Sequence, residues 1–123
     1  MGQVWGLKMK IIEKSYIAKL LDAISLLTQM SYENNNWRMK KYLNLTGLFL
    51  LMRDSQKDIR YLTWFPYING DICYTKGIIS TKIDKLTIED RNIQIQTQHS
   101  LYRLDIVDEN APQNLIKEMP KIW

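Results

Sequence analysis

The sequence has one cysteine and one histidine among its 123 residues. A lone Cys73 excludes an internal disulfide and any CxxC metal or redox motif, which fits a reducing cytoplasm. A zinc site needs three or four converging ligands, and His99 with Cys73 leaves only carboxylates to supply the others. We therefore expect no metal site and no cofactor.

Long apolar runs and glycine-rich loops are also missing. No run approaches the roughly 18 apolar residues of a membrane-spanning helix, and residues 1–10 lack the apolar core of a signal peptide. The five glycines form neither a phosphate-binding loop nor a dinucleotide fingerprint. We expect a soluble, unsecreted protein of the cytoplasm, with no membrane partner.

Candidates for catalysis are few. Ser100 follows His99 directly, and adjacent side chains on a strand point to opposite faces, so the two do not form a dyad by themselves. Cys73, between Ile72 and Tyr74, has the neighbours of a small core residue, although a pairing with His99 across strands would make it a nucleophile. We predict no catalytic residue and a protein that is not an enzyme.

The composition is that of a folded domain, with 46% apolar and 24% charged residues. We predict a single domain over residues 1–123, with residues 1–8 as a dispensable extension, because Met9 would serve equally well as a translation start. Residues 1–53 carry eight Lys/Arg against three Asp/Glu, and residues 54–123 carry nine against ten. The positive charge of the front half can attract nucleic acid or an acidic protein surface, although solvated lysines on a helix face are the commoner reason for it.

The front half predicts a helix from Tyr16 to Ser31 with Ser15 as its N-cap. Its apolar residues follow a helical stripe: Ile17, Leu20, Leu21, Ile24 and Leu27. The run Tyr32–Asn36 ends the helix, because asparagine side chains compete with the backbone ladder.

Residues 37–52 fit either a helix or a strand, and we choose a strand from about Leu43 to Arg53. The polar loop 54–58 and the β-rich run Ile59–Phe65 that follow it predict a hairpin. Pro66 then suggests a strand end or an edge, and Asn69-Gly70-Asp71 predicts a turn.

Two β-rich runs flank the polar turn 89–92 in the stretch from Ile72 to Val107. Alternation at Ile93, Ile95 and Thr97 changes phase to Tyr102, Leu104 and Ile106, as a tight turn or bulge at 98–100 would require. Pro112 opens a short helix that ends at Met119. The prediction is an α+β fold, with an N-terminal amphipathic helix packed on an antiparallel sheet of four to five strands and a short C-terminal helix.

One segment suggests binding: cations alternate with large aromatics from residue 36 to residue 42. Its candidate contact residues are Trp37, Arg38, Lys40, Lys41 and Tyr42. The cations could neutralise phosphates while an aromatic ring stacks on a base, and the same residue types make protein-interface hot spots. A third reading keeps the aromatics in the core and the cations in water.

The segments 77–83 and 97–104, Gly-Ile-Ile-Ser-Thr-Lys-Ile and Thr-Gln-His-Ser-Leu-Tyr-Arg-Leu, resemble small proteins of phages and other mobile elements. In these a Ser/Thr-containing strand precedes a Thr-x-x-Ser-x-Tyr-x-Leu strand. The resemblance implies a cytoplasmic protein that binds a host protein or ribonucleoprotein complex, as anti-CRISPR proteins do. It carries over no catalytic residue.

Overall fold

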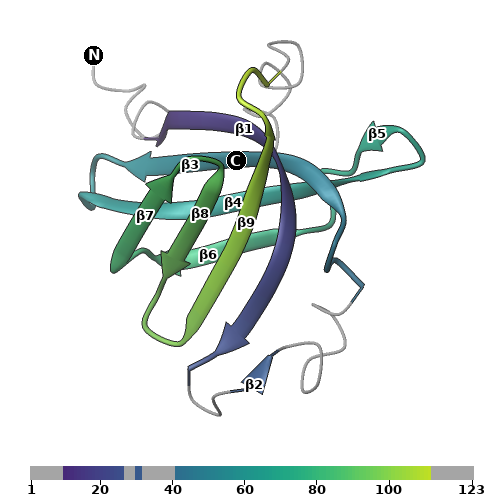
Figure 1. The fold of residues 1–123 in the computed structure, drawn as a ribbon. Helices are drawn as coiled ribbons and strands as arrows, with labels where there is room; N and C mark the ends of the chain where they lie inside the picture. Colours follow the sequence, from purple (N-terminus) through teal and green to yellow (C-terminus); the bar gives the residue numbers. More distant parts are fainter. Residues whose placement is uncertain (1–9, 27–29, 32–40, 112–123) are drawn as a thin grey trace, which may run out of the picture.

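The computed structural model describes residues 10–26, 30–31 and 41–111, and all regular structure in these residues is β. Nine strands form one sheet in which neighbours run antiparallel. The strands are β1 (Lys10–Ser25), β2 (Met30–Ser31), β3 (Thr46–Asp54), β4 (Ile59–Ile68), β5 (Asp71–Ile72), β6 (Ile78–Lys82), β7 (Lys85–Glu89), β8 (Asn92–Gln96) and β9 (Ser100–Asp108). Their order is β5-β4-β3-β1-β9-β8-β7, while β2 pairs with β1 and β6 pairs with β4 (Figure 1).

The long strand β1 belongs to both halves of the sheet. Its residues 10–19 pair with β3, and its residues 17–25 pair with β9. The register of β1 shifts three times, between Ile12 and Lys14 against β3, and between Ile17 and Ala18 and between Leu20 and Asp22 against β9. The first and third shifts leave an extra residue in β1, and the second leaves one in β9. Such bulges bend a strand and increase its twist, and β1 curves through Figure 1 accordingly.

The short link between β6 and β7 joins the two ends of the sheet. The backbone N–H of Ile83 donates to the carbonyl oxygen of Arg60 in β4 at 2.8 Å, and that of Asp84 donates to Gln96 in β8 at 2.8 Å. The neighbouring residues Ile83 and Asp84 thus bond to β4 and β8, which lie near opposite edges of the sheet. The sheet therefore curls around a common interior.

Alternation along the strands fills that interior with apolar side chains. Trp64 is fully buried there, and its indole Nε1 donates to the carbonyl oxygen of Ala18 at 3.0 Å. Tyr16 stacks on Phe49 at a centroid distance of 5.8 Å. A second apolar cluster occupies the other face of β3 and β4, with these buried members: Ile17, Leu48, Leu50, Met52, Tyr61, Phe65 and Ala111.

The predicted α+β fold is wrong. Residues 16–25 of the segment expected to form the N-terminal helix belong to β1, and residues 30–31 form β2. Ser15, the expected cap, lies opposite Leu50 in the ladder with β3. The physical reason is that β1 carries apolar side chains on both faces: of the predicted stripe, Leu20 packs in the interior and Ile17 in the second apolar cluster. The bulge after Leu20 adds a spacing of three between the interior residues Leu20 and Ala23. An extra residue in a strand separates neighbouring apolar residues of one face by three positions, which is also a spacing found on one face of a helix.

The hairpin predictions are correct. Residues 54 and 59 are the last pair before the turn of the β3–β4 hairpin. The predicted strand 43–53 and loop 54–58 are therefore confirmed as elements, although the strand β3 runs from Thr46 to Asp54. Asn69 and Gly70 have φ values of 54° and 87°, as the predicted turn requires. Ile93 and Ile95, then Tyr102 and Leu104, are buried on either side of the turn at 98–100.

Two further predictions, on Pro66 and on the number of strands, are wrong, and three others fall on residues that the structure does not describe. Pro66 does not end its strand, because β4 continues to Ile68 and Pro66 itself lies opposite Gly47. Residues 10–26, 30–31 and 41–111 form a sheet of nine strands, where four or five were expected. The extension 1–8, the helix exit at 32–36 and the C-terminal helix 112–119 fall outside the described residues.

At Gly77 the chain between β5 and β6 passes close to the backbone of β4, and a substitution there tests this close approach. Its φ is +113°, and a Cβ there would lie against the carbonyl oxygen of Trp64. We expect Gly77→Ala to lower the free energy of unfolding by about 2–3 kcal/mol, the upper part of the range for overpacked sites. Urea unfolding measures it. Gly70→Ala is the matched control, because Gly70 has φ +87° but open space around it; equal losses in the two variants would contradict the close approach.

Candidate functional site

The residues predicted to bind a partner are only partly within the described chain. Trp37, Arg38 and Lys40 lie outside it, and their role stays a prediction. Lys41 is exposed, with its Nζ 5.5 Å from the centroid of the Tyr42 ring. Tyr42 is buried, with its ring edge-on to Trp64 at 6.1 Å. Tyr42 is thus a core residue, and its ring is not available for stacking on a base.

The two nucleophile and base candidates do not meet. His99 is exposed in the β8–β9 turn, where its carbonyl oxygen accepts from the N–H of Leu26 at 2.8 Å. Cys73 follows β5, at a different end of the sheet (Figure 1), and is half-buried rather than part of the core. A hydrogen bond with the Thr75 hydroxyl lowers the pKa of the Cys73 thiol. Neither a cysteine–histidine pair nor, within residues 10–26, 30–31 and 41–111, a group of three or more metal-ligating side chains is present.

Two arginines face each other where β3 ends and β4 begins. Arg53 follows Leu51 by two residues and Arg60 precedes Leu62 by two, so both lie on the face that lines the interior. Both are at the strand ends, and their side chains are 44% and 46% exposed. The ladder places Arg53 directly opposite Arg60. Like charges in such a cross-strand pair are destabilising.

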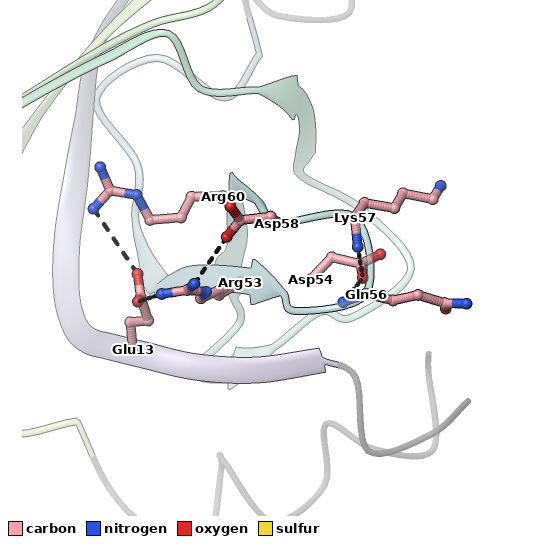
Figure 2. Close-up of polar contacts among 7 residues, drawn as sticks. All are labelled: Glu13, Arg53, Asp54, Gln56, Lys57, Asp58 and Arg60. Atoms are coloured by element: carbon pink, nitrogen blue, oxygen red, sulfur yellow. Dashed lines mark hydrogen bonds and ion pairs between the residues drawn. The ribbon is translucent and has the colours of Figure 1, made fainter. Parts of the chain in front are cut away.

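The bulge in β1 supplies a carboxylate to this pair. The register passes from Ile12 to Lys14, so Glu13 has no residue opposite it. Its Oε2 is 3.7 Å from Nη1 of Arg53, and its Oε1 is 3.9 Å from Nη1 of Arg60 (Figure 2). Charge-assisted hydrogen bonds are shorter, roughly 2.7–2.9 Å. Glu13 therefore reduces the repulsion between the arginines without forming a close bond to either.

The hairpin turn orients the Arg53 side chain through a hydrogen bond with Asp58. Nη2 of Arg53 donates to Oδ1 of Asp58 at 2.8 Å. The turn itself is held by Asp54, whose Oδ1 accepts the N–H groups of Gln56 at 3.1 Å and Lys57 at 3.2 Å (Figure 2). Side-chain acceptors of this kind stabilise tight turns. Arg53 is thus oriented by the turn, while the Arg60 guanidinium has the looser contact with Glu13.

A hollow of about 170 Å³ opens beside the arginines. It is lined by Arg53, Asp58, Ile59, Arg60, Lys82 and Ile83. Lys82 comes from the end of β6, which the Ile83 N–H ties to the carbonyl oxygen of Arg60. Three cations and one carboxylate therefore surround a space with an apolar side at Ile59 and Ile83. The arrangement suits an anion, since guanidinium groups bind carboxylates and phosphates through paired donors.

A larger hollow of about 570 Å³ on the outer face of β7, β8 and β9 differs in character. It is lined by Thr87, Glu89, Asp90, Arg91, Asn92, Gln94 and Arg103. Cations and carboxylates are balanced there, and Arg91 also donates to the carbonyl oxygen of Ile106 at 3.0 Å. This face has no preference for one sign of charge. We therefore take the arginine pair with Glu13, Asp58 and Lys82 as the candidate site and call it the arginine site.

Sequence reasoning did not single out the arginine site. A signal existed for its main pair, because a hairpin closed by residues 54 and 59 sets Arg53 opposite Arg60. Glu13 and Lys82 gave no such signal, since the first depends on a bulge and the second on the pairing of β6 with β4.

Within the described residues, no helix has the length and apolarity to cross a bilayer. No protein-family model matches this chain, and neither a curated protein nor a solved structure matches it.

Proposed function

We propose that this protein is a non-enzymatic binding protein that attaches to a larger, nucleic-acid-handling complex of a host cell and modulates it by occupying a surface. The observation that carries the proposal is the cross-strand pair of Arg53 and Arg60 on the exposed end of the sheet. A pair of like charges opposite each other costs stability. A local arrangement that costs stability, such as this pairing of like charges, is expected mainly where the residues serve function.

The chemistry of the arginine site indicates an anionic partner surface. Arginine is enriched among interface hot spots, and its planar fork recognises carboxylates and phosphates in pairs of hydrogen bonds. A nucleic-acid-handling complex offers both groups. A CRISPR-Cas effector is one complex of this kind, in keeping with the resemblance of segments 77–83 and 97–104 to mobile-element proteins, and the place of action would be the host cytoplasm.

A second candidate function is binding of single-stranded RNA or DNA without a protein partner. The observation in its favour is the convergence of Arg53, Arg60 and Lys82 on one hollow. The predicted contacts of Trp37, Arg38, Lys40 and Lys41 stay an expectation in favour of this function, because cations with an aromatic ring suit a single strand.

A pull-down from host lysate tests the proposed function. The wild-type protein should retain a stoichiometric host protein, in both nuclease-treated and untreated lysate, and Arg53→Ala with Arg60→Ala should lose most of it, because hot-spot truncations typically cost about 2 kcal/mol or more. Lys85→Ala with Arg103→Ala is the matched control, since it removes the same charge from the outer face of β7–β9. Retention of RNA alone would favour the second candidate. A lane with neither, or equal loss in both double variants, would contradict the proposal.

A further inference from the structure

Glu13 lies beside both guanidinium groups of the arginine site, although it does not line the hollow itself. It reaches both arginines from a bulge, at distances of 3.7 and 3.9 Å, which are longer than charge-assisted hydrogen bonds. Its side chain is 27% exposed, so solvent reaches it. A carboxylate held this loosely adds little stability, because exposed ion pairs contribute little.

We propose that the arginine site binds a phosphate group of a nucleic-acid strand and that Glu13 competes with it as an internal substitute for that phosphate. The proposal rests on the second candidate function, binding of a single RNA or DNA strand, which it deepens by naming the group recognised and the residue that competes with it. Binding would exchange the Glu13 carboxylate for a phosphate that reaches Arg53, Arg60 and Lys82 together. No covalent step is involved.

A phosphate fits the site better than a second carboxylate would. The cations converge from three strands, β3, β4 and β6, whereas a planar carboxylate is matched by one guanidinium. Tetrahedral phosphate oxygens can accept donors from several directions at once. Asp58 is already bonded to Arg53 at 2.8 Å and keeps that guanidinium oriented while Glu13 leaves.

Exposed cations next to the site favour a strand with repeated phosphates over an isolated phosphate. Lys14 adjoins Glu13 in β1, and Lys57 lies in the turn that Asp54 holds; both are exposed. A strand that places one phosphate in the hollow has further phosphates for these lysines. Each phosphate neutralised adds to affinity and to its salt dependence.

Fluorescence polarisation with a labelled single-stranded oligothymidine is the test. Glu13→Gln keeps the shape of the side chain and removes its charge, so it should bind the strand about two- to fivefold more tightly than the wild type, the range that corresponds to a weak exposed ion pair. Glu89→Gln is the control, because Glu89 is an exposed strand carboxylate beside the other hollow and should leave affinity within error. Thermal unfolding of each variant confirms that it is folded.

The outcomes separate the inference from the function on which it rests. Unchanged or weaker binding by Glu13→Gln overturns the competition, and absence of binding by both wild type and Glu13→Gln overturns the phosphate site. If the strand binds equally well to the wild type and Glu13→Gln, the inference fails and the second candidate function stands. If the strand does not bind while the pull-down still retains a host protein through Arg53 and Arg60, both fail and the binding of a host complex stands. Competition by inorganic pyrophosphate as effective as that by unlabelled oligothymidine would overturn the preference for a strand.

Discussion

Trp64→Ala should lower the free energy of unfolding by about 3–5 kcal/mol, the usual loss when a fully buried large aromatic is truncated. The indole is inaccessible to solvent and lies edge-on to Tyr42. Its Nε1 donates to the carbonyl oxygen of Ala18, in the part of β1 that pairs with both β3 and β9. Truncation would leave a cavity and also remove the bond that ties β4 to β1 across the interior.

Urea unfolding followed by circular dichroism measures this loss. Trp64→Phe is the matched variant, because it keeps most of the ring volume and removes the N–H donor; a smaller loss of about 1–3 kcal/mol is expected for the unpaired carbonyl and the missing ring. If Trp64→Ala unfolded within about 1 kcal/mol of the wild type, below the range for buried aromatics, Trp64 would not be a core residue.

Charge reversal at the arginine site, Arg53→Glu with Arg60→Glu, should weaken binding of single-stranded oligothymidine by more than about tenfold at low salt. The reason is that the variant replaces two phosphate-binding cations by repulsive charges next to Glu13. The plot of log K against log salt should also become shallower by about 0.7 for each phosphate that the variant no longer neutralises, the value for single strands. Fluorescence polarisation at several salt concentrations gives both quantities.

The control for charge reversal carries the same change in net charge elsewhere. Lys85→Glu with Arg103→Glu alters the outer face of β7 and β9, away from the arginine site. It should lower affinity only through the weaker overall field, which salt screens. Equal losses in the two double variants would show that net charge, not the arginine site, drives binding.

Local signals were enough to predict the hairpins. A polar loop between β-rich runs, the turn residues Asn69 and Gly70, and the change of phase around residues 98–100 each depend on neighbours in sequence. The structure confirms all three. Register then follows from the turn, which is why the pairing of Arg53 with Arg60 could have been derived from the sequence.

The first strand could not be predicted in this way. Its two bulges change the spacing of inward-facing residues from two to three, and nothing in the sequence marks Glu13 or Leu21 as an extra residue. Closure of the sheet depends on bonds from Ile83 to Arg60 and from Asp84 to Gln96, which join residues far apart in sequence. The surroundings of the arginine site follow from these same features, so sequence reasoning located the basic front half but not the site.

An NMR titration of the nitrogen-15-labelled protein with unlabelled single-stranded oligothymidine tests the arginine site most directly. We predict that chemical shifts change most at the backbone amides of Glu13, Arg53, Arg60 and Lys82 and at the guanidinium Nε–H groups of the two arginines. The same resonances should change at a lower strand concentration in Glu13→Gln. Changes confined to the outer face around Thr87, or no changes at all, would contradict the assignment of the arginine site as the place where an anionic strand binds.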